Sequence, residues 1–258
     1  MTNLKIIKIG GNVINNKKLL NGFLDDFAQL AVPKILVHGG GRSASELSKQ
    51  MGIAPKMING RRITDAQTLD IVTMVYSGKI NKNIVAQLQA RNCNSIGFSG
   101  ADGNSIVAVK RPVKEIDYGF AGDIVQVNTR AIDVLLQHEI TPIFCAITHD
   151  ENGQLLNTNA DTIAAELAIG LSKNYNVSLY YCFEKNGVLK HIEDDDSVIE
   201  TINTSIYEDL KEQNIIHEGM LPKIHNCLQA IQKGVTSVHI GNNKMPFNNH
   251  IKCTTFQL

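Results

Sequence analysis

The sequence predicts an α/β fold in which helices cover both faces of a mostly parallel sheet. Short apolar runs alternate along the chain with amphipathic stretches of helical period, which is typical of strand–helix–strand units. The runs that we expect to form buried strands are residues 4–9, 34–38, 95–98, 141–147, 178–183 and 236–240. Three glycine clusters follow or approach these runs, where an open α/β sheet turns from strand to helix.

The stretches between these runs predict the remaining elements. We expect helices at residues 18–30, 43–51, 66–89, 129–138, 161–171, 205–213 and 221–233. Residues 53–64 and 104–127 alternate in polarity around central turns, which predicts hairpins near a sheet edge. The polar stretch 185–196 is expected to be a surface loop, and its run Asp194-Asp195-Asp196 a solvated part of it. A lobe boundary is expected near residues 171–176, where a helix ends in polar residues.

The composition excludes several classes of protein. The chain has 258 residues, and its 25 Lys and Arg balance its 25 Asp and Glu, so no nucleic-acid or anionic-membrane partner is expected. No apolar run reaches the ~18 residues of a membrane span, and no export signal is visible, so we expect a cytoplasmic protein. The five cysteines form no CxxC and the eight histidines form no HExxH, which predicts free thiols and no metal site.

Two of the glycine clusters are candidates for binding phosphate. They are Gly10-Gly11, after Lys8, and Gly39-Gly40-Gly41, after His38. Glycine lets backbone N–H groups approach an anion closely, and the helix that follows adds its dipole. Each cluster can equally be a simple tight turn, and for the third cluster, residues 99–103, we favour that interpretation.

Common nucleotide-binding and hydrolase motifs are missing. The chain has no GxxxxGK[ST] and no GxGxxG, so neither a P-loop nor the dinucleotide fingerprint is present. The run His38-Gly39-Gly40-Gly41 is typical of the oxyanion loop of α/β-hydrolases, but residues 97–101 lack the last glycine of a GxSxG elbow. A serine hydrolase is therefore disfavoured.

Two further motifs open helices. Asn157-Thr158-Asn159-Ala160-Asp161 has more polar side chains than one helix cap needs. The segment 218–223, Glu-Gly-Met-Leu-Pro-Lys, places Pro222 in a first turn and ends on Lys223.

Taken in order, these motifs resemble the amino acid kinase family and, within it, the N-acetylglutamate kinases. The family's K-x-G-G is matched by Lys8–Gly11, its V-H-G-G-G by residues 37–41 and its N-G-x-R-x-T by residues 59–64. Its N-x-N-A-D is matched by residues 157–161, and its G-G-M-x-x-K by residues 218–223 with Glu218 in place of the first glycine. The resemblance covers nearly the whole chain.

The resemblance implies an open three-layer αβα sandwich with two lobes. The N-terminal lobe, residues 1–172, would bind the amino acid and form a homodimer, and the C-terminal lobe, residues 173–258, would bind ATP. The activity implied is phosphorylation of the γ-carboxylate of N-acetyl-L-glutamate in arginine biosynthesis, with Mg-ATP as donor and no metal held by the protein alone.

The resemblance also implies roles for single residues. Lys8 and Lys223 would neutralise the transferring phosphoryl group, and Asp161 would orient both lysines. Gly10 and Gly11 would present N–H groups to the phosphates of ATP. The residues expected to bind the acceptor are Gly39, Gly40, Arg62 and Asn157.

Physical chemistry agrees with this assignment. A γ-carboxylate is already ionised at pH 7, so no general base is needed. The difficulty is to bring one anion to another, which cations and oriented amides solve by positioning and charge stabilisation. A planar arginine fork suits the α-carboxylate of the acceptor.

Three points stay open, and the first two come from features outside the family pattern. Residues 182–188 read C-F-E-K-N-G-V where most relatives have S-D-V-x-G-[IV], so Glu184 replaces an Asp and the nucleotide contacts are open. Arg61, beside Arg62, can be a surface charge or can meet a second carboxylate, as in N-succinyl-L-glutamate. A non-catalytic amino-acid-sensing module is the third alternative. Since Lys8 lies close to the start of the chain, we expect a homodimer that arginine does not inhibit.

Overall fold

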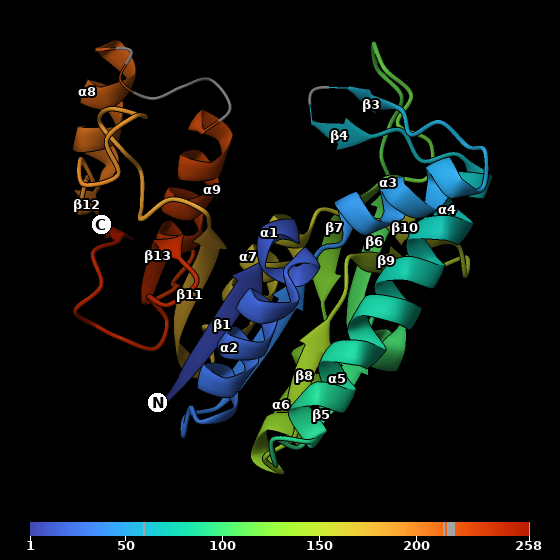
Figure 1. Cartoon of the computed structure of the whole chain (residues 1–258), viewed down its shortest axis with the longest axis horizontal. Helices are drawn as coiled ribbons and strands as arrows, with labels where there is room; N and C mark the ends of the chain where they lie inside the picture. The colour runs from blue at the N-terminus through green and yellow to red at the C-terminus, as the bar shows by residue number, and fades with distance from the viewer. Residues whose placement is uncertain (59, 214, 216–219, 258) are drawn as a thin grey trace.

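The structure is a computed structural model that describes residues 1–58, 60–213, 215 and 220–257 (Figure 1). Asn59, Glu218 and Gly219, which belong to the sequence motifs, lie outside the described residues. Every predicted helix and strand lies wholly or almost wholly inside them.

An eight-stranded sheet forms the centre of the molecule, with strand order β12-β14-β13-β11-β1-β2-β8-β5. Every neighbouring pair is parallel except β13 and β14. The strands are β1 (Thr2–Ile9), β2 (Lys34–His38), β5 (Ser95–Phe98), β8 (Thr141–Phe144), β11 (Tyr175–Phe183), β12 (Thr201–Ile202), β13 (Ser237–Asn242) and β14 (Thr254–Phe256). The mostly parallel sheet that the sequence predicts is therefore confirmed.

Two smaller sheets lie beside the main one. The predicted hairpins are confirmed as antiparallel pairs: β3 (Met57–Ile58) with β4 (Arg61–Arg62), and β6 (Ile106–Lys110) with β7 (Gly122–Val127). The second pair lies at one edge of a smaller sheet and not in the main sheet. It joins β9 (Ile147–His149) and β10 (Leu155–Asn157) in a separate four-stranded sheet.

The separate sheet forms because the strand expected at residues 141–147 divides. Its first part, β8, stays in the main sheet, and after Cys145 and Ala146 the chain continues as β9 in the smaller sheet. The carbonyl of Ala146 accepts a hydrogen bond from the N–H of Thr158, outside either sheet.

Helices cover both faces of the main sheet, as Figure 1 shows for α2 in front and α7 behind. The helices are α1 (Gly11–Asn15), α2 (Lys17–Ala28), α3 (Gly41–Gln50), α4 (Ala66–Thr73), α5 (Asn81–Gln89), α6 (Thr129–Gln137), α7 (Ala160–Leu171), α8 (Thr204–Glu212) and α9 (Leu221–Gln232). Asparagine or aspartate side chains cap several N-termini, as at Asn16, Asp65 and Asn159. In the described part of the chain, no helix is long and apolar enough to cross a membrane.

The single helix expected at residues 66–89 contains a π-helical segment, η1 (Met74–Ile80), between α4 and α5. This segment presents Tyr76 and Ile80, both buried, to the turn between β2 and α3. A Cβ atom on Gly40 would lie 2.6 Å from each of these side chains, whereas one on Gly39 would meet nothing nearer than 3.9 Å. Packing therefore requires glycine at position 40 but not at position 39.

We predict that Gly40→Ala lowers the free energy of unfolding by about 1–3 kcal/mol, because the added methyl group overpacks the site against Tyr76 and Ile80. Gly39→Ala is the matched control, and its loss should stay under about 1 kcal/mol. Urea denaturation of both variants measures the difference. Equal destabilisation would contradict this account of the turn.

Candidate active site

One cavity of about 990 Å³ is lined by all the residues that the sequence predicts for the site. It opens where β1 and β2 end, at the carboxyl edge of the parallel sheet, as expected for an open α/β fold. The predicted residues in its lining are Lys8, Gly10, Gly11, Gly39, Gly40, Arg62, Asn157, Asp161 and Lys223. Five separate segments of the chain thus converge on one space.

An ion pair between Lys8 and Asp161 lies at the centre of this cavity. The Lys8 Nζ atom is 2.7 Å from Asp161 Oδ1, and Lys8 is 8% exposed at the end of the middle strand β1. Asp161 lies in the first turn of α7, where the N-cap Asn159 accepts hydrogen bonds from the N–H groups of Asp161 and Thr162. The positive end of the helix dipole favours a carboxylate there.

The second ammonium group comes from Lys223, in the first turn of α9. Burial lowers the pKa of Lys223, while the nearby Asp161 carboxylate raises it and the Lys8 ammonium lowers it further. Asp161 thus attracts both ammonium groups. A carboxylate between two cations reduces their mutual repulsion, which a site for two lysines and an incoming anion needs.

The two glycine turns begin helices whose N-termini face the cavity. Gly10 precedes α1 and Gly40 precedes α3, and neither N-cap has a side chain that binds the free N–H groups. A hydrogen bond of 2.7 Å from Ser43 Oγ to Asn15 Oδ1 joins these two short regions. Backbone donors are therefore available to an anion at both turns.

Arg62 is buried and only partly satisfied by the protein. Its Nη2 atom donates to the carbonyl of Gly41 at 2.8 Å and to Ser45 Oγ at 2.7 Å. Its Nη1 atom is buried and has no hydrogen-bond partner among the described residues. A buried guanidinium with an unused donor is able to bind a carboxylate bidentately or through one nitrogen. Asn157, on the same side, donates from Nδ2 to Thr64 Oγ1 at 3.0 Å.

A second, apolar cavity of about 460 Å³ adjoins the first and shares Lys8, Gly10, Gly11, Phe183 and Ile240 with it. Its further lining includes the apolar side chains Val13, Val188, Leu189, Ile192 and Met220. An apolar group that carries negative charge on the Lys8 side suits this combination of lining residues.

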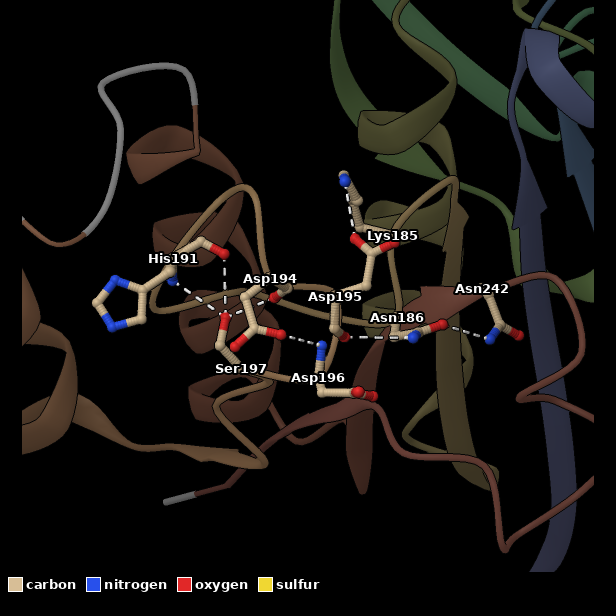
Figure 2. Close-up of polar contacts among 8 residues, drawn as sticks. All are labelled: Lys185, Asn186, His191, Asp194, Asp195, Asp196, Ser197 and Asn242. Carbon is tan, nitrogen blue, oxygen red and sulfur yellow. Dashed lines mark hydrogen bonds and ion pairs between the residues drawn. The ribbon is translucent and has the colours of Figure 1, made fainter.

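Residues 184–198 form a loop over this second cavity, and Figure 2 shows the contacts that order it. Lys185 Nζ lies 2.7 Å from Asp195 Oδ1, and Asn186 bonds both to the carbonyl of Asp195 and to Asn242. Asp194 Oδ1 accepts from the N–H of Asp196. The acidic run therefore shapes an exposed loop, and the described part of the chain holds no group of three or more His, Cys, Asp or Glu suited to a metal.

Several lining residues were not singled out from the sequence. Tyr76 comes from η1, Arg111 and Tyr118 come from the chain between β6 and β7, and Phe183 ends β11. Their place depends on long-range packing, and only Phe183 had a local signal, because it lies where the chain departs from the family pattern. Glu184 lines the apolar cavity, and the exposed Arg61 lines the larger one.

Comparison with known proteins gives consistent matches. The sequence profile of the amino acid kinase family matches residues 3–242. The acetylglutamate kinase of Cytophaga hutchinsonii is 56% identical over 93% of this chain and 91% of its own length. That of Methanopyrus kandleri is 33% identical over 93% and 95%. The solved structure of a Giardia carbamate kinase superposes with a TM-score of 0.71 over 99% of this chain and 98% of its own, at 14% identity, which supports the fold alone.

His38, which precedes the second glycine turn, is fully buried and neutral. Its Nε2 atom lies 3.1 Å from Asn81 Nδ2, and its Nδ1 atom lies 2.8 Å from the carbonyl of Gly39. Burial lowers its pKa from 6.5 to about 4; the bond to Gly39 opposes this shift and the charge of Lys82 adds to it. Below pH 6.5, His38 therefore binds a proton in the unfolded chain, whereas in the folded protein it binds one only near pH 4 and below.

We predict that the free energy of unfolding falls as the pH drops from about 6.5 to about 4, with His38 contributing on the order of 3 kcal/mol in full. The partly buried His239 has a pKa lowered to about 4 as well, so His38→Gln should remove only part of the dependence. Urea midpoints at pH 7 and pH 5 measure it, with the exposed His250→Gln as control. An unchanged pH difference in His38→Gln would contradict the prediction.

Proposed function

This chain belongs to the amino acid kinase family, and from that premise we propose that it transfers the γ-phosphoryl group of ATP to the γ-carboxylate of N-acetyl-L-glutamate. The product is N-acetyl-L-glutamyl 5-phosphate, an intermediate of arginine biosynthesis. The observation that carries the proposal is the convergence of Lys8, Asp161, Lys223 and Arg62 on one cavity that adjoins an apolar one. Close relatives named as acetylglutamate kinases support it.

In this proposal the larger cavity binds the acceptor. The unused Nη1 donor of Arg62 meets the α-carboxylate, and Asn157 binds the acyl-amino group. The N–H groups of Gly39 and Gly40 face the γ-carboxylate, which attacks without a general base because it is already ionised. Because the site holds this anion in line with the phosphate, the entropy cost of bringing the two reactants together is met on binding.

The apolar cavity binds the adenine, and the phosphates extend past Gly10 and Gly11 to the two lysines. Lys8 and Lys223 then balance the negative charge of the transferring group from two directions, while Asp161 orients Lys8 and opposes the effect of burial on the pKa of Lys223. Mg²⁺ enters with ATP as part of the substrate.

The two cavities are lined mainly by different parts of the chain. Residues 1–172 supply most of the lining of the acceptor cavity, and residues 173–258 supply most of the apolar lining of the nucleotide cavity. All five cysteines are free, which supports a reducing cytoplasmic location. Light scattering tests the expected homodimer, and turnover measured with and without arginine tests the expected insensitivity to arginine.

N-succinyl-L-glutamate is a second candidate acceptor, because the acceptor cavity is lined by two arginines besides Arg62. Arg61 is exposed, and it forms no ion pair within the described part of the chain. Arg111 is already bonded to Asp123, from Nη2 to Oδ1 at 2.6 Å. A succinyl group carries a carboxylate that Arg61 can bind, whereas an acetyl group carries no charge.

The test of function is ADP release with Mg-ATP and, in parallel, N-acetyl-L-glutamate, N-succinyl-L-glutamate and free L-glutamate. We expect turnover only with the acylated forms. If the succinyl form is faster, Arg61→Gln should lower its kcat/KM by on the order of tenfold and leave that of the acetyl form within about twofold. Absence of turnover with all three, from a folded protein, would favour the amino-acid sensor instead.

We further predict that Lys8→Met and Lys223→Met each lower kcat by about 10²–10³, because each removes a charge that stabilises the transition state. Lys173→Met, at an exposed position away from both cavities, is the matched control and should retain full activity. Steady-state kinetics at saturating Mg-ATP and acceptor measure the effect. Wild-type kcat in either of the first two variants would refute the assigned roles.

A further inference from the structure

The aromatic ring of Phe183 faces both ammonium groups of the site. Its centroid lies 4.2 Å from Lys223 Nζ and 5.4 Å from Lys8 Nζ. Both distances fall within the ~6 Å over which the negative face of an aromatic ring attracts a cation. One uncharged side chain thus contacts two cations that come from distant parts of the chain.

The position of the ring follows from strand geometry. Phe183 is the last residue of β11, and in the parallel pairing with β1 its second neighbour Tyr181 lies opposite Lys8. Alternate residues of a strand share one face of the sheet, so Tyr181 and Phe183 lie on the same side, with centroids 6.4 Å apart. Tyr181 also donates a hydrogen bond of 3.1 Å to the carbonyl of Asp161. The Phe183 ring therefore lies beside a tyrosine that binds the backbone of Asp161.

Phe183 also lies at the junction of the two cavities. It is one of the residues that line both of them, together with Lys8 and Gly10. Under the proposed function, the phosphoryl group has to pass from the apolar cavity to the acceptor cavity at this junction. The ring is thus beside the path of the group and beside the charges that stabilise it.

The two lysines present an electrostatic problem that one carboxylate solves only in part. Asp161 is 2.7 Å from Lys8, while Lys223 forms no ion pair in the described segments and is partly desolvated. A second carboxylate would hold Lys223 in place, but it would also repel the phosphates. An aromatic face attracts the ammonium group without adding a net negative charge.

We propose that Phe183 is a positioning residue for phosphoryl transfer, whose ring holds the ammonium groups of Lys223 and Lys8 toward the phosphates at the junction. This inference rests on the proposed function. It predicts that the cation-binding strength of the ring, and not only its bulk, sets the rate of the chemical step.

The first test changes the ring electronically at nearly constant shape. Phenylalanine analogues with one, two and three ring fluorines are incorporated at position 183 of the full chain, since each fluorine weakens the negative face. We expect kcat to fall progressively, by about 2- to 30-fold in all, which is the range that about 0.5–2 kcal/mol gives at 1.36 kcal/mol per tenfold. KM values should change little, Phe183→Tyr should retain activity and Phe183→Leu should lose it.

The matched control is the same series at Phe144, a fully buried core ring that packs on Phe98 at 5.3 Å and lines neither cavity. Fluorination there should leave kcat unchanged. Equal losses in the two series would mean that fluorine acts through folding, and this would overturn the proposal.

A second readout does not depend on activity. In protein with 13Cε-labelled lysine, the methylene protons beside the Lys223 ammonium should show an upfield ring-current shift, assigned by its loss in Lys223→Arg. Phe183→Tyr should keep the shift and Phe183→Leu should abolish it. Absence of the shift in the wild-type protein, or a flat fluorine series in an active enzyme, would overturn the proposal. A chain that shows the shift but phosphorylates no acylglutamate would instead refute the proposed function.

Discussion

The contact between the Lys8 ammonium and the Asp161 carboxylate, 2.7 Å apart, joins the middle strand of the main sheet to the first turn of α7. Lys8 is almost fully buried, and a buried cation is stable only with a partner. Asp161 supplies that partner, and the positive end of the helix dipole favours a carboxylate at its place in the first turn of α7. The charge of the same carboxylate also attracts Lys223. One carboxylate therefore reduces the repulsion between two cations in a cavity that must also bind an anion. This one contact thus joins two elements of the fold and positions two of the groups on which the proposed chemistry depends.

Around the ion pair, the chain provides donors for anions and leaves them unused. The glycine turns before α1 and α3 present free N–H groups, and Arg62 keeps one buried nitrogen without a partner in the described residues. The packing of Tyr76 and Ile80 against Gly40 holds the second turn at the position that the acceptor would need. A site so rich in donors is arranged in advance for negative charge, which is how phosphoryl transfer between two anions gains most of its rate.

Much of this arrangement could be predicted from the sequence. The strands at residues 34–38 and 95–98 were predicted to the residue, because each is a short, mostly apolar run bounded by proline, glycine or polar residues, although Ile96 in the second is exposed. The π-helical η1 could not be separated from its helical neighbours, since the apolar pattern continues through it. The short strands β12 and β14 depend on pairing between distant segments and leave no local signal. At the site, the motifs indicated the lysines, Asp161 and Arg62, whereas the contact of Phe183 with both lysines exists only in the folded chain.

The central claim is that the acceptor is the side-chain carboxylate of an acylated glutamate, and trapping the product tests it most directly. An acyl phosphate reacts with hydroxylamine to give a hydroxamate, which mass spectrometry identifies. With Mg-ATP and N-acetyl-L-glutamate we expect the γ-hydroxamate to accumulate in step with ADP, and with free L-glutamate we expect none. ADP release without hydroxamate would mean that ATP is hydrolysed by water, and it would contradict the assignment of this cavity to a carboxylate acceptor.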